Sequence, residues 1–155
     1  MKENKWTKLG MIYSVNNDHS KLISHASNPL AKHLYGDVYR IFYSGRDTEN
    51  KSSVSYVDYN LQTLKIENDY KKPIASPKDN TFYSHGITIG NHWSDGLNSF
   101  IGFMGWQQKK REHWRGDIGK INLETGEISL ILGKNKEDKI SLSYPHIIKE
   151  DGLYK

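Results

Sequence analysis

Three histidines occupy similar places in the sequence, each near a short apolar segment: His25, His85 and His146. A neutral imidazole can hydrogen-bond a sugar hydroxyl, relay a proton or ligate a metal, although each residue alone is equally compatible with a structural role. His25 and His85 recur at equivalent points of the repeat described below, so we predict that both bind substrate. No spacing typical of a metal motif such as H-E-x-x-H is present, and we therefore predict no metal site and no cofactor.

A second set of residues that could bind or act on a ligand consists of Arg46, Asp47 and Trp106. Arginine can donate two parallel hydrogen bonds to sugar hydroxyls or to an anion, and an adjacent aspartate can orient it. The alternative is a structural Arg–Asp pair that closes a turn. The indole of Trp106 can stack on a sugar ring, or it can fill the core. We predict that Arg46 and Trp106 bind substrate and that Asp47 is catalytic.

Strands, rather than helices, must position these side chains. Alternation with period two, with Gly, Asp and Asn at the breaks, predicts strands bounded by turns. No segment combines an apolar stripe of period 3.6 with helix caps, so we predict an all-β chain with little helix. Strands are expected at residues 38–43, 53–59, 64–67, 86–89, 99–105, 117–123 and 128–132.

The strands repeat as units. Each unit opens with a short apolar segment, passes a Gly/Asp turn and continues with an aromatic strand, in which Tyr39, Phe100 and Tyr154 hold the same place. Four strands per unit is typical of β-propeller blades, and a β-sandwich is the alternative. We predict one partial propeller domain over residues 1–155, with blades at about 24–76 and 82–133 and the start of a third at about 140–155. Because the ring would be unclosed, we expect a truncated chain that self-associates through open blade edges.

The composition excludes several classes of protein. The chain has 155 residues, no cysteine and a formal net charge of +4, so disulfides and thiolate metal sites are excluded. Its basic residues are dispersed, which argues against a nucleic-acid partner. One cluster of basic residues is found at 109–115, around Trp114. We interpret it as a solvated hairpin loop or, alternatively, as a loop that contacts an anionic sugar or phosphate. The polar N-terminus and short apolar stretches predict no membrane partner and a cytoplasmic protein.

Several linked motifs together resemble a known family. They are SHASNP (24–29), YRIFYSGRD (39–47), NKSSV (50–54), FYSHGI (82–87), GW (105–106) and SYP (143–145). This set resembles the five-bladed β-propellers related to glycoside hydrolase families 32, 43, 68 and 130. The likeness is nearest to uncharacterised bacterial members of surface-polysaccharide gene clusters, of which this chain looks like the N-terminal portion.

The resemblance implies a sugar site in a funnel along the propeller axis, lined by the inner strand of each blade. Hydrolysis by such enzymes needs two carboxylates that flank the glycosidic bond. At the positions where relatives carry these acids, the chain has Asn28 before Pro29, Tyr83 with Ser84, and Tyr144 before Pro145. We therefore predict that Asn28 and Tyr144 bind substrate.

Three functions follow from this pattern. The first is a carbohydrate-active, glycosyl hydrolase-like propeller that acts on or binds a bacterial glycan. The second is a non-catalytic sugar-binding accessory protein of polysaccharide biosynthesis, which the absence of the expected acids favours. The third is a scaffold for protein interactions. The expected ligand in the first two is a carbohydrate or a sugar-containing small molecule.

Overall fold

A computed structural model describes residues 6–108, 114–133 and 141–155 of the chain. Strands account for all of the regular secondary structure in these residues, and none of them is helical, which confirms the all-β prediction. Accordingly, the described part of the chain has no helix that is long and apolar enough to cross a membrane. Most of the basic cluster predicted around Trp114 lies outside the described residues, at 109–113.

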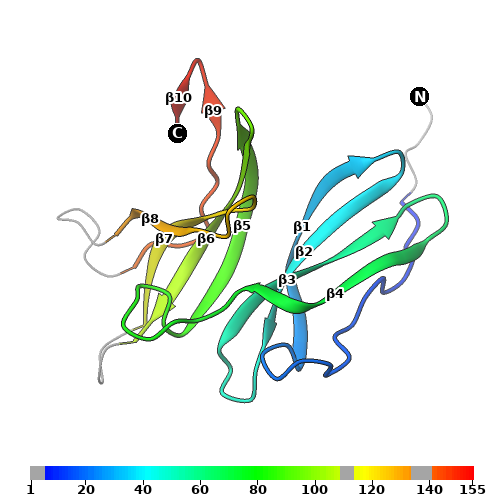
Figure 1. The fold of residues 1–155 in the computed structure, drawn as a ribbon, viewed down its shortest axis with the longest axis horizontal. Coiled ribbons are helices and arrows are strands. Elements are labelled where there is room, and N and C mark those ends of the chain that lie inside the picture. Colours follow the sequence, from blue (N-terminus) through cyan, green and yellow to red (C-terminus); the bar gives the residue numbers. More distant parts are fainter. Residues whose placement is uncertain (1–5, 109–113, 134–140) are drawn as a thin grey trace.

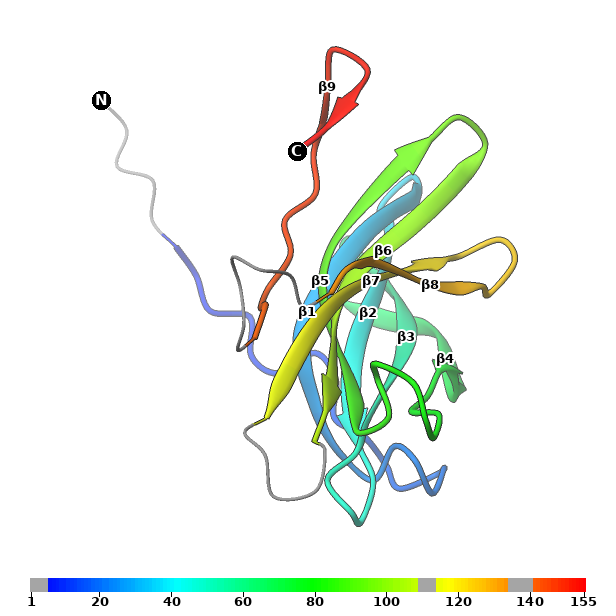
Figure 2. The same ribbon diagram turned by 90° about the vertical axis from the view of Figure 1, so that its left-hand side faces the viewer.

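Eight of the strands form two antiparallel units of four (Figure 1). Within each unit, consecutive strands pair through short connections. The first unit contains β1 (Ser24–Tyr35), β2 (Val38–Arg46), β3 (Ser52–Asn60) and β4 (Lys65–Ala75). The second contains β5 (Gly86–Asp95), β6 (Asn98–Gln107), β7 (Arg115–Asn122) and β8 (Ile128–Leu132). The C-terminal segment then runs beside the second unit to a hairpin of β9 (Lys149–Glu150) and β10 (Leu153–Tyr154), as Figure 2 shows.

The two units join at one parallel bridge, between Ser52 of β3 and Gly86 of β5. β5 forms a full ladder with β6 along one edge. Apart from the bridge, the backbone groups along its other edge, toward the first unit, need other partners. The hydroxyl of Ser52 accepts a hydrogen bond from the Ile87 amide at 3.0 Å. The hydroxyl of Ser44 donates to the Ile87 carbonyl at 3.2 Å and accepts from the Ile89 amide at 3.4 Å. Buried serines thus replace a β-ladder between the units, and the sheet does not close on itself.

One apolar core spans both units. It is built from alternate residues of the strands, because successive side chains of a strand point to opposite faces. Its buried members are Phe42, Val54, Ala75, Tyr83, Ile87, Ile89, Ile101, Phe103 and Ile121. The shared core means that the two units pack as one body, with Ile87, Ile101 and Phe103 completely buried.

A smaller core lies on the other face of the first unit. Tyr43 and Val57 point away from the main core and are covered by Leu22 and by the N-terminal segment, including Tyr13 and Val15. The hydroxyl of Tyr13 lies 3.2 Å from that of Tyr43, and partial burial together with this contact raises the pKa of Tyr13. The N-terminal segment therefore covers a face that the first unit would otherwise expose.

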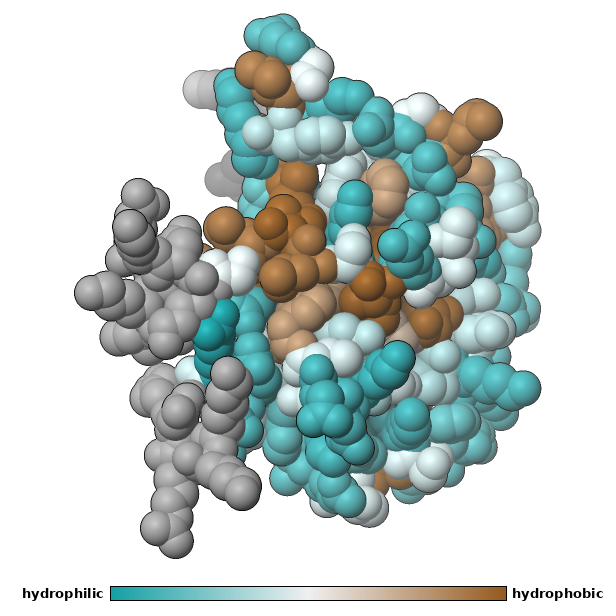
Figure 3. Space-filling view, turned by 60° about the vertical axis from the view of Figure 1, so that its left-hand side comes forward, coloured by the Kyte–Doolittle hydropathy of each residue, from teal (hydrophilic) through white to brown (hydrophobic). Residues whose placement is uncertain are grey.

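The outer edge of the second unit is more exposed. In Figure 3, apolar side chains gather in the central part of a largely hydrophilic surface. Leu130, Ile131 and Leu132 of β8 are all exposed, and β8 pairs only with β7 among the described strands. Self-association through such an edge stays a prediction.

The segment at 141–148 differs from the sequence expectation. Tyr144 and Pro145 were expected to open a third unit, but residues 141–148 form no strand. Proline has no amide hydrogen to donate to a ladder. The side chain of Asn91 instead makes the pair of bonds that a strand would make: it donates to the Ile147 carbonyl at 2.6 Å and accepts from the Ile147 amide at 2.9 Å.

Candidate functional site

A cavity of about 580 Å³ lies where the two units meet. It is found beside the Ser52–Gly86 bridge, at the end of β2 and at the starts of β3 and β5. Its walls are formed by residues from both units and from the C-terminal segment. These residues are Ser27, Asn28, Ser44, Arg46, Asn50, Ser52, His85, Thr88, Trp106, Trp114, Ser141 and Tyr144.

Two irregularities of β1 shape one wall. The pairing of β1 with β2 shifts register between Ser24 and Ser27, and again between Ser27 and Leu30. Within these bulges, His25 has φ 64° and Asn28 has φ 54°, both in the left-handed region. Bulges redirect side chains, and left-handed backbone in residues other than glycine is found more often at functional sites. Here the second bulge places Asn28 on the cavity wall.

Hydrogen bonds hold this wall in place. The hydroxyl of Ser27 donates to the Ser44 carbonyl at 3.0 Å, which spans the break in the β1–β2 ladder. Tyr144, on the opposite segment, also has a left-handed backbone, with φ 44°. Its ring is exposed at the cavity, because the chain turns there just before Pro145.

Three rings form an aromatic wall. The centroids of His85 and Trp114 are 4.4 Å apart, and those of Trp106 and Trp114 are 6.4 Å apart with the planes nearly perpendicular. The indole nitrogen of Trp106 donates to the Thr88 hydroxyl at 2.8 Å. Edge-to-face packing of this kind fixes ring orientation. The wall therefore presents apolar ring surface beside hydroxyl groups.

The charges around the cavity are unequal. Arg46 is the only lining residue with a permanent charge, and no aspartate or glutamate is found among the described lining residues. Burial lowers the pKa of His85, and the nearby positive charge of Lys51 lowers it further, against the opposing effect of Asp47 and Glu49. His85 is therefore neutral at pH 7 and can both donate and accept hydrogen bonds.

Asp47, which was predicted to be catalytic, is not among the lining residues. It lies in the loop between β2 and β3, where its Oδ1 accepts hydrogen bonds from the backbone amides of Glu49 at 2.9 Å and Lys51 at 2.8 Å. Aspartate commonly stabilises turns in this way. The structure thus gives this carboxylate a role in the loop, beside the cavity rather than on its wall.

The structure brings five of the seven predicted site residues to one cavity: Asn28, Arg46, His85, Trp106 and Tyr144. The other two, His25 and Asp47, do not line it. His25 is exposed, and its Nδ1 lies 2.9 Å from the hydroxyl of Ser24.

The expected equivalence of His25 and His85 is wrong. Ser24 pairs with Arg46 at the end of β2, and Gly86 pairs with Trp106 near the end of β6. His25 directly follows Ser24, the first paired residue of β1. His85 directly precedes Gly86, the first paired residue of β5. The bulges of β1 have no counterpart at the start of β5, and so the two rings take different places.

Sequence reasoning missed seven lining residues: Ser27, Ser44, Asn50, Ser52, Thr88, Trp114 and Ser141. Most are small hydroxyl residues, whose types do not distinguish a site from a turn. One signal was available, since Trp114 is an aromatic residue in a basic segment.

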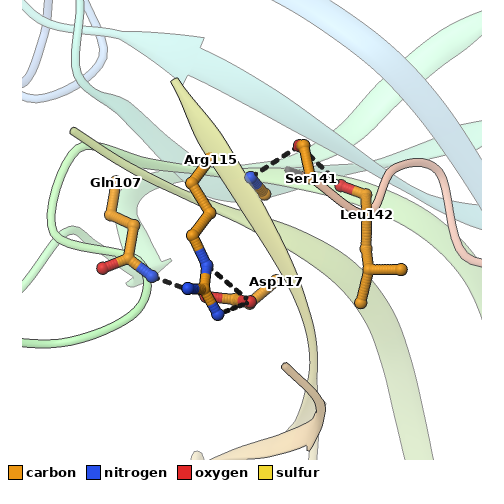
Figure 4. Close-up of polar contacts among 6 residues, drawn as sticks. Gln107, Arg115, Asp117, Ser141 and Leu142 are labelled. Atoms are coloured by element: carbon orange, nitrogen blue, oxygen red, sulfur yellow. Dashed lines mark hydrogen bonds and ion pairs between the residues drawn. The ribbon is translucent and has the colours of Figure 1, made fainter. Parts of the chain in front are cut away.

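An ion pair at the start of β7 lies next to a hydrogen bond that reaches the lining residue Ser141 (Figure 4). Arg115 donates to Asp117 from Nη2 at 2.7 Å and from Nε at 3.0 Å, and Gln107 donates to the same carboxylate at 2.5 Å. Gly116 lies between Arg115 and Asp117 in the sequence, and its amide donates to the hydroxyl of Ser141 at 2.8 Å. The rigid strand end therefore holds Ser141 at the cavity.

The described residues include no group of three or more His, Asp or Glu side chains placed to hold a metal ion. The chemistry available at the cavity is hydrogen bonding, ring stacking and the positive charge of Arg46.

Comparisons with known proteins place the chain beside uncharacterized relatives. No protein-family model matches the sequence. No solved structure matches it either. Two curated proteins, from two strains of Mycobacterium tuberculosis, are each 30% identical to the chain over 158 residues and are described as uncharacterized. The match covers 97% of this chain and 53% of each relative, so the chain spans about half the length of the curated relatives it matches.

Proposed function

We propose that the chain is part of a β-propeller that binds a glycan in the cavity between its first two blades. The two four-stranded units, which share one apolar core, support the assignment of blades. The resemblance of the sequence motifs to glycoside hydrolase-like propellers points in the same direction. On this reading, residues 141–155 belong to a third blade.

One observation carries the proposal: aromatic rings and amide and hydroxyl side chains line one cavity together. A sugar ring has apolar faces that stack on indole and a rim of hydroxyls that donate and accept hydrogen bonds. Trp106 and Trp114 offer the first kind of contact. Asn28, Asn50 and the neutral ring of His85 offer the second.

The favoured form of the proposal is binding without hydrolysis. Glycosidases need one carboxyl group to protonate the leaving oxygen and a second to act as base or nucleophile. The described lining contains neither. The chain thus resembles an accessory protein of polysaccharide biosynthesis more than an enzyme.

Glycan binding is tested by screening the purified 155-residue chain on an array of neutral and acidic bacterial oligosaccharides, followed by titration of the best binders. We expect Trp106→Leu to weaken binding by tenfold or more, because stacking on an aromatic ring is lost. Trp6→Leu is the matched control, since Trp6 is fully exposed and lies outside the cavity. Equal affinity of the Trp106→Leu variant and the parent chain would refute the proposed site.

Hydrolysis is the second candidate function, because Asp47 directly follows the lining residue Arg46 and is the carboxylate next to the cavity in the sequence. Slow sugar release from the glycan that binds best, lost in Asp47→Asn but retained in Asp37→Asn, would establish it. Asp37 is a suitable control because it lies in the β1–β2 turn, at the far end of β2 from the cavity. No release by the parent chain would leave binding as the function.

A further inference from the structure

We infer that the glycan carries an anionic group, a carboxylate, sulfate or phosphate, which Arg46 binds at the cavity. The inference rests on the proposed glycan site and specifies the class of sugar that the site takes. It follows from a difference between Arg46 and the other arginines of the structure.

The two other described arginines have carboxylate partners. Arg40 donates to Asp58 at 2.8 Å, and Arg115 donates to Asp117 at 2.7 Å. In the described part of the chain, no carboxylate lies within ion-pair distance of Arg46. Arg46 lines the cavity, and none of the described side chains pairs with its guanidinium.

The acids nearest in sequence to Arg46 are already engaged. Asp47 directs Oδ1 to two backbone amides of its loop. Glu49 forms an ion pair with Lys51 at 2.9 Å, which lowers the pKa of the carboxyl group. Both carboxylates are thus engaged within the loop, and neither forms an ion pair with Arg46.

The backbone around Arg46 is fixed. Arg46 pairs with Ser24 on one side and with Ser52 on the other, and its carbonyl accepts from the Ile23 amide at 2.9 Å. The side chain therefore projects from a stable strand end. The planar guanidinium matches the two oxygens of a carboxylate, sulfate or phosphate, and it binds a neutral hydroxyl less strongly.

The rest of the cavity suits an anion attached to a sugar. Asn28 and Asn50 add amide donors, and no described lining carboxylate repels a negative charge. Trp106 supplies the ring surface for the sugar itself. A free inorganic anion would use the donors but not the aromatic wall.

The test compares matched pairs of sugars by isothermal titration and by tryptophan fluorescence. The pairs are glucose with glucuronate and galactose with galacturonate, and the further probes are glucose 6-sulfate, glucose 6-phosphate and inorganic sulfate. We expect each acidic sugar of the preferred type to bind about tenfold to a hundredfold more tightly than its neutral partner, because charge-assisted hydrogen bonds are the stronger kind. The advantage should shrink as salt is raised. The uronates and the 6-substituted sugars distinguish a carboxylate from a sulfate or phosphate.

Three variants locate the effect. Arg46→Gln should abolish the preference for the acidic sugar while keeping the affinity for the neutral one. Arg46→Lys should retain part of the preference, because it keeps the charge and loses the paired donors. Lys65→Gln removes a positive charge at the start of β4, where Lys65 pairs with Asn60 at the far end of β3 from the cavity, and should change nothing.

The outcomes separate the inference from the function on which it rests. Equal binding of neutral and acidic sugars would overturn the inference and leave the glycan site intact. Sulfate binding as tightly as the acidic sugars would also overturn it, because the sugar would then contribute nothing. Failure of every sugar on the array and in titration would contradict the proposed function itself.

Discussion

The indole nitrogen of Trp106 donates a hydrogen bond of 2.8 Å to the hydroxyl of Thr88. The two residues lie on neighbouring strands, β6 and β5, and both line the cavity. Because the indole N–H is already used, a ligand meets the face of the ring rather than its donor. The bond also fixes the angle of the aromatic wall relative to the inner strand.

Removing the acceptor of this bond should loosen the wall. Thr88→Val keeps the shape of the side chain and loses the hydroxyl, so we expect glycan affinity to fall by about threefold to tenfold, the effect of one neutral hydrogen bond. The indole N–H resonance of Trp106 should shift at the same time. Thr63→Val, in the exposed β3–β4 turn, is the control. Unchanged affinity together with a shifted resonance would mean that ring orientation does not matter for binding.

The junction of the units should be sensitive to a single methyl group. A Cβ on Gly86 would lie 2.3 Å from the hydroxyl oxygen and 3.0 Å from the amide nitrogen of Ser52. We expect Gly86→Ala to lower the free energy of unfolding by about 1–3 kcal/mol, because the units must separate to admit it. Urea denaturation measures the effect. For Gly133→Ala, where the nearest atom is 3.5 Å away, we expect almost no change.

The ion pair of Arg115 and Asp117 should contribute far more to the free energy of unfolding than a surface pair does. Asp117 is almost fully buried, and its removal leaves Arg115 and Gln107 without their acceptor. We expect Asp117→Ala to cost about 3 kcal/mol in the free energy of unfolding. Asp18→Ala breaks an exposed pair with Lys71 and should cost about 1 kcal/mol or less. Equal costs for the two variants would show that the buried pair gains nothing from its setting.

The pH dependence of stability should reveal the lowered pKa of His92. Burial lowers its pKa, the positive charge of Lys32 lowers it further and Glu124 opposes them, while its buried Nε2 finds no hydrogen-bond partner among the described residues. At pH above about 6.5 the ring is neutral in both the folded and the unfolded chain. Below that pH the unfolded chain takes up a proton first, so the free energy of unfolding falls as the pH drops from about 6.5 through the lowered pKa.

We expect His92→Phe to flatten this dependence between pH 7 and 5 and to leave stability at pH 7 unchanged or higher, because an unpaired buried polar atom is removed. Some slope should remain, since the pKa of His85 is lowered as well. Thermal denaturation across this range measures both effects. His33→Phe is the control, as His33 is exposed and its Nε2 lies 2.9 Å from the Gly36 carbonyl. A slope that His92→Phe leaves intact would assign the effect to other groups.

Period-two alternation and turn residues are local signals, and they determined most of the strands from the sequence. The expected strand at 128–132 matches β8, and those at 53–59 and 99–105 differ from β3 and β6 by no more than two residues at either end. The all-β class follows from the same pattern. The expected strand at 64–67 was too short, however: β4 continues past Pro73 to Ala75. Proline is tolerated there because β4 is an edge strand, which the sequence does not reveal.

The sequence also determined residue types of the candidate site, since Arg46 and Trp106 were chosen for their chemistry and Tyr144 for its place in the resemblance. Only the tertiary structure decided which of the candidates meet. Two bulges in β1 separate His25 from Asn28, and the loop hydrogen bonds of Asp47 engage a carboxylate that was expected to be catalytic. Bulges and bridges such as Ser52–Gly86 depend on contacts between distant residues. Local alternation carries no information about such contacts, so the cavity emerges only when the two units pack together.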